Sequence, residues 1–119
     1  MKKEWFSATM LLPNGERAVV AIEKLRDYCL NEEHLRGKHK AWVFATTLGF
    51  TAEDAPKLLE MLLAAAANQE AQVGENDEFG QRYILDIALV GLTELVTVRS
   101  VWIIRPQADV PHLVTCYVN

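Results

Sequence analysis

The spacing of apolar residues changes once along the chain, from a period near 3.6 residues to a period of 2. The first half therefore predicts three helices, over about residues 22–31, 38–48 and 54–69. Gly49 follows the second helix, where a glycine commonly ends one. The third helix is expected to start at residue 54, because Pro56 then falls in its first turn and costs no hydrogen bond.

Alternation of polar and apolar positions begins after Gly74 and predicts strands. Three are expected, over residues 82–89, 95–105 and 112–118, and a fourth can join them at residues 70–73. Short connections between them favour an antiparallel meander. The order of elements predicts an α+β fold, with three N-terminal helices packed on one face of a three- to four-stranded antiparallel sheet.

A chain of 119 residues fits one domain with a single core. We expect residues 1–20 to form an N-terminal arm or hairpin around the turn signal Pro-Asn-Gly at 13–15. Residues 21–70 are then the helical half, and residues 71–119 the antiparallel meander.

The two sheet faces differ in polarity. The middle strand turns Thr97, Arg99 and Arg105 to the face that also receives Thr115 and Tyr117. On the first strand, Arg82 and Asp86 share that polar face. Two interpretations are open: an anion-binding face, or a solvated face with an Arg82–Asp86 pair. The opposite, apolar face should meet the helices through Val96, Val98, Trp102, Ile104, Val114, Cys116 and Val118.

A cluster of cations precedes the second helix in a chain of formal net charge -4. It comprises Arg36, Lys38, His39 and Lys40, with Gly37 between them. At a helix start, a phosphate could meet backbone donors, a cation and an imidazole together. The alternative is a solvated first turn, in which cations oppose the helix dipole. Trp42, two residues further on, is expected in the core with Phe44 and Trp102.

Other features narrow the class of protein. The histidines and cysteines lack the spacing of a zinc site, and no dinucleotide- or nucleotide-binding glycine motif occurs, so no metal and no cofactor is predicted. No apolar run is long enough for a membrane span. Cys29 and Cys116 are expected to be reduced core thiols in a cytoplasmic protein.

Several segments in order resemble an uncharacterised bacterial domain-of-unknown-function family, over about residues 17–118. They are Leu25-Arg-Asp-Tyr-Cys-Leu-Asn31, Arg36-Gly-Lys-His-Lys-Ala41, Phe79-Gly-Gln-Arg-Tyr83, Val98-Arg-Ser-Val-Trp-Ile-Ile104 and Leu113-Val-Thr-Cys-Tyr-Val118. The helices followed by a meander that ends in Leu-Val-Thr-x-Tyr are in turn similar to ribonucleases of the barnase/RelE-like superfamily, which includes toxins of toxin–antitoxin systems. The chain departs from the family pattern at Trp42, where a basic residue is expected, and at Leu35, where a proline is expected. The missing cation weakens the case for a phosphate held by the second helix.

The resemblance to ribonucleases implies a metal-independent RNase-like toxin. Cleavage of RNA without a metal needs a base, an acid and cations around the phosphate. We expect His39 to transfer protons, and Lys40 and Arg99 to stabilise the phosphate. The substrate-binding residues are then Arg36, Lys38, Arg82, Thr115 and Tyr117.

A second class of function remains open. The acidic chain could be a non-catalytic interaction protein, either the antitoxin or immunity partner of a toxin or an assembly module. The expected partner is RNA in the first case and a small cognate protein encoded nearby in the second. A binder of a small carboxylate or phosphate is a third possibility.

Overall fold

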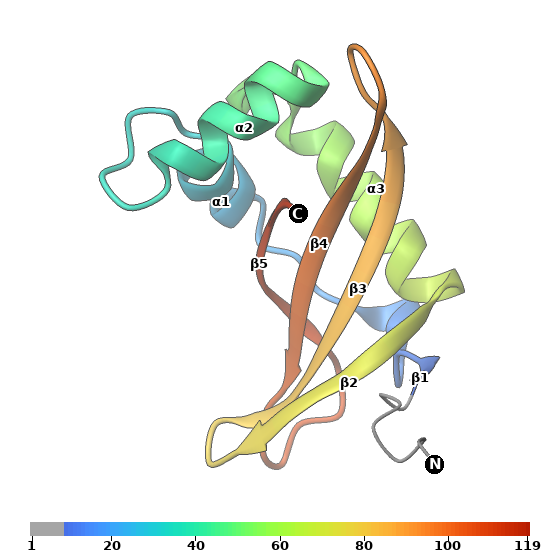
Figure 1. Ribbon diagram of the computed structural model, residues 1–119. Helices are drawn as coiled ribbons and strands as arrows, with labels where there is room; N and C mark the ends of the chain where they lie inside the picture. Colours follow the sequence, from blue (N-terminus) through green and yellow to red (C-terminus); the bar gives the residue numbers. More distant parts are fainter. Residues whose placement is uncertain (1–8) are drawn as a thin grey trace, which may run out of the picture.

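The computed structural model describes residues 9–119 and shows a twisted antiparallel sheet with helices along one side (Figure 1). The strand order is β1-β2-β3-β4-β5. The strands are β1 (Thr9–Leu11), β2 (Glu70–Asp77), β3 (Gly80–Val90), β4 (Leu95–Ile104) and β5 (His112–Val118). The helices are α1 (Ile22–Lys24), η2 (Leu25–Cys29), α2 (Lys38–Leu48) and α3 (Ala55–Asn68), with short 3-10 turns η1 (Gly15–Arg17) and η3 (Ala52–Asp54).

The α+β class is confirmed, but two details of the expected architecture are wrong. The sheet has five strands rather than three or four, because Thr9–Leu11 pairs with the free edge of β2. The helices consequently follow a strand instead of opening the fold. Within residues 9–20, the two extended parts of the arm pair with other strands and not with each other. The second of these parts bridges the opposite edge of the sheet, where Val19 pairs with His112 in parallel. The part of the arm before Thr9 lies outside the described residues.

The helices begin and end close to their expected bounds. Gly49 ends α2 at φ 75, a left-handed conformation that favours glycine. Thr51 and Asp54 form the capping box before α3, and Pro56 lies in its first turn. The first helix differs in kind, since it continues from α1 into a π-helix in which the Leu30 amide donates to the Leu25 carbonyl at 2.8 Å.

One hydrophobic core joins the helices to one face of the sheet. Trp102 of β4 and Phe44 of α2 are fully buried in it, as predicted. Buried Ser100 satisfies the indole, accepting a hydrogen bond from Trp102 Nε1 at 2.9 Å and donating one to the Leu85 carbonyl at 2.7 Å. α3 runs across the sheet, while α1 and α2 lie beside β5 (Figure 1). Trp42 is 54% exposed, so its predicted place in the core is wrong.

The register of β5 changes at a bulge, and this alters which of its residues meet the core. Val101 is opposite Thr115, but the next residue, Trp102, is opposite Leu113. Val114 is thereby left as the extra residue, and it is half-buried while Leu113 and Cys116 are buried. The expected inward position of Val114 is therefore wrong, because simple alternation does not survive a bulge. Within residues 9–119, no helix is long and apolar enough to cross a membrane.

Candidate functional site

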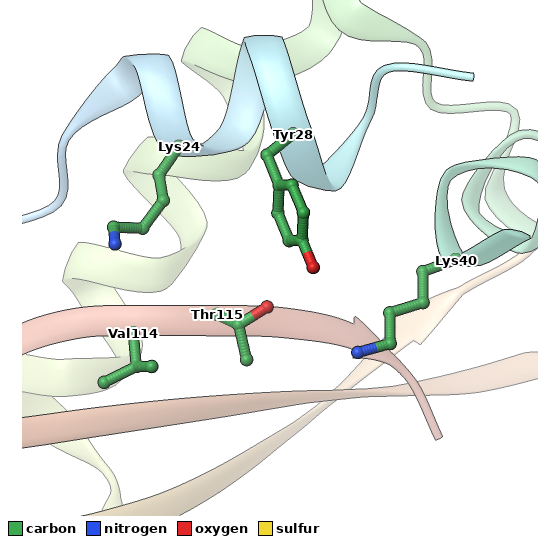
Figure 2. Close-up of a pocket in the computed structure, with 5 residues that line it drawn as sticks. All are labelled: Lys24, Tyr28, Lys40, Val114 and Thr115. Carbon is green, nitrogen blue, oxygen red and sulfur yellow. The ribbon is translucent and has the colours of Figure 1, made fainter. Parts of the chain in front are cut away.

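A pocket of about 450 Å³ opens between the first helix, α2 and the edge strand β5 (Figure 2). Five side chains line it: Lys24 from α1, Tyr28 from η2, Lys40 from α2, and Val114 and Thr115 from β5. The hydroxyls of Tyr28 and Thr115 point into the space, and the two lysines approach from opposite sides (Figure 2). The pocket thus joins two ammonium groups to two hydroxyl groups.

The local backbone explains how these groups come together. Tyr28 belongs to the π-helix, whose extra residue per turn changes the direction of the side chains that follow Lys24. The start of α2 packs directly against Tyr28. A Cβ built on Gly37 would lie 2.6 Å from the Tyr28 carbonyl oxygen, so only glycine permits this approach. Thr115 and Val114 stand at the bulge of β5, where the strand bends.

The lysines of the pocket, Lys24 and Lys40, have no carboxylate partner in the described part of the chain. In a chain of net charge -4, two cations without a carboxylate partner that face one pocket favour an anionic ligand. Hydroxyl donors at the same place suit oxygen atoms of a phosphate or carboxylate.

Polar contacts link the rim of the pocket to the open face of the sheet. Lys40 Nζ lies 4.7 Å from the centre of the Tyr117 ring, within cation–π range. Tyr117 is opposite Arg99 on β4. Arg99 binds Asp86 through two hydrogen bonds, from Nε at 2.9 Å and from Nη2 at 3.0 Å, and this contact raises the arginine pKa. Lys40, Thr115, Tyr117 and Arg99 are therefore brought together, but Asp86 neutralises the arginine.

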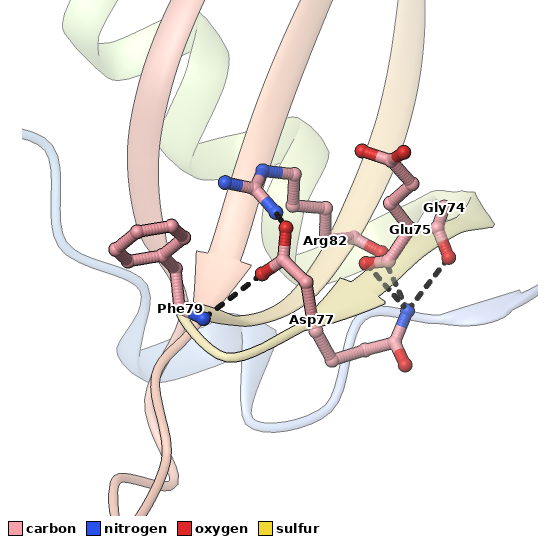
Figure 3. A network of polar contacts seen from close by, with 6 residues as sticks. Gly74, Glu75, Asp77, Phe79 and Arg82 are labelled. Atoms are coloured by element: carbon pink, nitrogen blue, oxygen red, sulfur yellow. Dashed lines mark hydrogen bonds and ion pairs between the residues drawn. The ribbon is translucent and has the colours of Figure 1, made fainter.

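Arg82, in contrast, lies away from this group. Its guanidinium binds Asp77 at 2.8 Å in the turn between β2 and β3 (Figure 3). Asp77 also accepts the Phe79 amide at 2.9 Å, and this hydrogen bond lowers the pKa of its carboxyl. The anticipated Arg82–Asp86 pair is wrong, because the sheet register puts Asp86 opposite Arg99. Arg82 precedes Asp86 by four residues on β3, about 13 Å at the usual rise per residue.

The other predicted residues of the cationic cluster lie outside the pocket lining. Arg36, Lys38 and His39 are exposed at the start of α2. The His39 ring stacks on exposed Trp42, with centroids 6.4 Å apart and an angle of 18° between the planes. The cluster therefore divides, since Lys40 turns toward β5 and its neighbours turn to solvent. The catalytic and substrate-binding roles of all these residues stay predictions.

The two cysteines meet directly behind the pocket wall. The Cys29 sulfur lies 3.9 Å from Thr115 Oγ1. Cys29 also accepts hydrogen bonds from the thiol and the backbone amide of Cys116. The hydrogen bond from the Cys116 thiol has the largest effect on the Cys29 pKa and lowers it. Burial raises this pKa, whereas the Cys116 amide, Thr115 and Lys24 lower it further, and the result is a pKa of about 6. The pKa of Cys116 is raised, chiefly by its hydrogen bond with Cys29.

Sequence reasoning missed three of the five pocket residues, Lys24, Tyr28 and Val114. Tyr28 belongs to the segment Leu25-Arg-Asp-Tyr-Cys-Leu-Asn31 that carries the family resemblance, and Lys24 directly precedes it, so this segment was the available signal for both. Helical periodicity could not indicate where the Lys24 and Tyr28 side chains point, because it assumes an α-helix where the chain forms a π-helix. Among the described residues, no three His, Cys, Asp or Glu side chains gather as metal ligands would.

Comparison with known proteins shows that the chain contains an uncharacterised domain. A family model described as Domain of unknown function (DUF6883) matches residues 11–119. No curated protein and no solved structure matches the chain.

Proposed function

We propose that the chain, which belongs to the DUF6883 family, is an RNase-like protein that binds an RNA phosphate in the lysine pocket and cleaves the strand without a metal. One observation carries the proposal. Lys24 and Lys40, both without a carboxylate partner within residues 9–119, converge with the Tyr28 and Thr115 hydroxyls on one pocket. The chain is acidic overall, so this is a local and not a general affinity for anions.

The pocket contains the kinds of group that such a cleavage needs. Lys24 and Lys40 would stabilise the charge that grows on the phosphate, and Thr115 would orient one of its oxygens. The 2′-hydroxyl must lose a proton and the leaving 5′-oxygen must gain one. Tyr28 is the proton-transfer candidate inside the pocket, and His39 is the candidate from the first turn of α2.

The order of elements also supports this proposal. The helices α1 to α3 are followed by the meander β2 to β5, which is the order implied by the similarity to barnase/RelE-like ribonucleases. A shared order of elements suggests a fold relationship, whereas activity depends on the site. Arg99 then has a positioning role, because it is held by Asp86 and stands beside Tyr117, which in turn contacts Lys40.

The test is cleavage of a labelled single-stranded RNA by the purified chain in the presence of EDTA. We expect fragments that end in a 2′,3′-cyclic phosphate, and loss of cleavage in Lys40→Ala and in Lys24→Ala. Tyr28→Phe and His39→Ala then show which residue transfers protons. Lys57→Ala is the matched control, since Lys57 lies over the Phe50 ring on another part of the surface. Full cleavage by the double lysine variant, or inhibition of the wild type by EDTA, contradicts the proposal.

A second candidate, the non-catalytic interaction protein, is favoured by a different observation. The turn between β3 and β4 exposes three large apolar side chains, Val90, Leu92 and Leu95, at 85%, 64% and 72%. Such a cluster is typical of a protein contact. Expression of the gene alone and with its neighbouring gene separates the candidates. Growth arrest that the neighbour relieves supports the ribonuclease, whereas a stable complex without any arrest supports the interaction protein.

A further inference from the structure

Cys29 and Cys116 form a pair of thiols that the proposed RNA chemistry does not use. Cys29 ends the π-helix η2, and Cys116 lies in the middle of β5. They are far apart in sequence, but the Cys29 sulfur lies 3.9 Å from the hydroxyl oxygen of Thr115, the residue next to Cys116. Both cysteines are buried and free. They join two elements that also supply the pocket residues Tyr28 and Thr115.

The surroundings of Cys29 stabilise a thiolate. β5 is an edge strand, and within the described residues only the bridge from Val19 at His112 pairs with its outer row of backbone groups. The Cys116 amide from this strand donates to the Cys29 sulfur, and the Cys116 thiol and the Thr115 hydroxyl add two further donors. The positive charge of Lys24 acts in the same direction. A thiolate, rather than a thiol, is the reactive form of cysteine.

The pocket lies next to this sulfur. Thr115 lines the pocket and contacts the Cys29 sulfur at 3.9 Å. Cys29 as a whole is only 1% exposed, which excludes bulky reagents.

We propose that Cys29 and Cys116 are a redox-active pair, in which hydrogen peroxide entering by the pocket oxidises Cys29 and the two cysteines then form a disulfide. The Cys29 thiolate attacks one peroxide oxygen, the O–O bond breaks, and the other oxygen leaves as water after taking a proton. The Cys116 thiol, losing its proton, attacks the sulfenic sulfur and releases a second water. Two thiols and one hydrogen peroxide thus become one disulfide and two waters.

The disulfide would connect the two walls of the pocket. It would hold the end of η2 against β5, and so keep Tyr28, next to Cys29, in a constant relation to Thr115, next to Cys116. Oxidation would therefore act on the ligand pocket whatever its ligand is, and the inference does not depend on the proposed ribonuclease activity.

The experiment treats the reduced full-length chain with hydrogen peroxide under native conditions. We expect the intact mass to fall by two hydrogen atoms, with a Cys29–Cys116 peptide on mapping. Cys116→Ser should instead give a Cys29 sulfenic acid that dimedone traps, and Cys29→Ser should give much less adduct at Cys116. A bulky aromatic disulfide reagent should react with the wild type only after unfolding.

Two results would overturn the proposal: no disulfide in the folded wild type, or faster trapping at Cys116 than at Cys29. The wild-type measurement stands even if a variant fails to fold. In that case, dimedone added to the wild type together with peroxide shows by peptide mapping which cysteine is oxidised first.

Discussion

Replacement of Lys40 by alanine is the most direct test of anion binding in the pocket, because the same helix offers a matched control. Lys38 is two residues earlier on α2, carries the same charge, and is exposed outside the pocket lining. Lys38→Ala and Lys40→Ala therefore change the net charge equally. If anions bind in the pocket, only the second replacement should matter strongly.

The expected magnitude follows from the position of the ammonium group. Two unit charges about 4 Å apart attract by about 1 kcal/mol in water and about 4 kcal/mol where the effective dielectric constant is near 20. Lys40 is half-buried and lies over the Tyr117 ring. Its contribution to the binding free energy of an anion should therefore lie near the lower of these two values, at about 1.4 kcal/mol. This corresponds to a roughly tenfold rise in Kd. Lys38→Ala should change Kd less than about twofold, because salt screens exposed charges beyond about 8 Å.

The assay is fluorescence anisotropy with a short 2′-O-methyl oligoribonucleotide, which the chain cannot cleave through the 2′-oxygen. Binding is measured over a range of salt concentrations. The slope of log K against log salt should become less steep by about 0.7 in Lys40→Ala, the value for one phosphate contact on a single strand. Lys38→Ala should keep the wild-type slope. Equal losses in the two variants, or no loss in either, would refute the pocket as the anion site.

Two further replacements test the framework of the site. Ser100→Ala should lower the free energy of unfolding by about 2–3 kcal/mol, because it leaves the buried Trp102 indole without an acceptor. Guanidinium denaturation measures this loss, and Thr97→Ala on the open face is the control. The control should lower the free energy of unfolding by about 0.5 kcal/mol or less. An equal loss in both variants would contradict the role of Ser100. Gly37→Ala should cost about 1–3 kcal/mol, since its Cβ would lie 2.6 Å from the Tyr28 carbonyl oxygen. It should also weaken anion binding by displacing Tyr28, and unchanged stability with unchanged binding would show that the contact is unimportant.

Much of the local structure could be predicted from the sequence. The end of α2 followed from Gly49, and the start of the third helical segment followed from Pro56. Each of these signals acts within one turn of helix, so no distant contact is needed to interpret it. The polar face of β3 and β4 was likewise visible as alternation, with Arg99 and Asp86 on the same side.

The candidate site was only partly visible. Lys40, Thr115, Tyr117 and Arg99 were nominated from the sequence, and the structure brings them together. Arg82 was grouped with Arg99 because both are arginines on one sheet face. Their distance along the strands depends on register, and register is set by the packing of whole strands.

By itself, the sequence of this chain determined the kinds of element and their order, because backbone propensity and capping depend on neighbouring residues. The tertiary structure alone decided that Thr9–Leu11 completes the sheet, that β5 has a bulge, and that Cys29 meets Cys116. It also decided that Lys24 and Tyr28 share a pocket with Lys40. These outcomes arise from pairing and packing between segments distant in sequence, where many arrangements satisfy the same local pattern and only burial of the common core selects one.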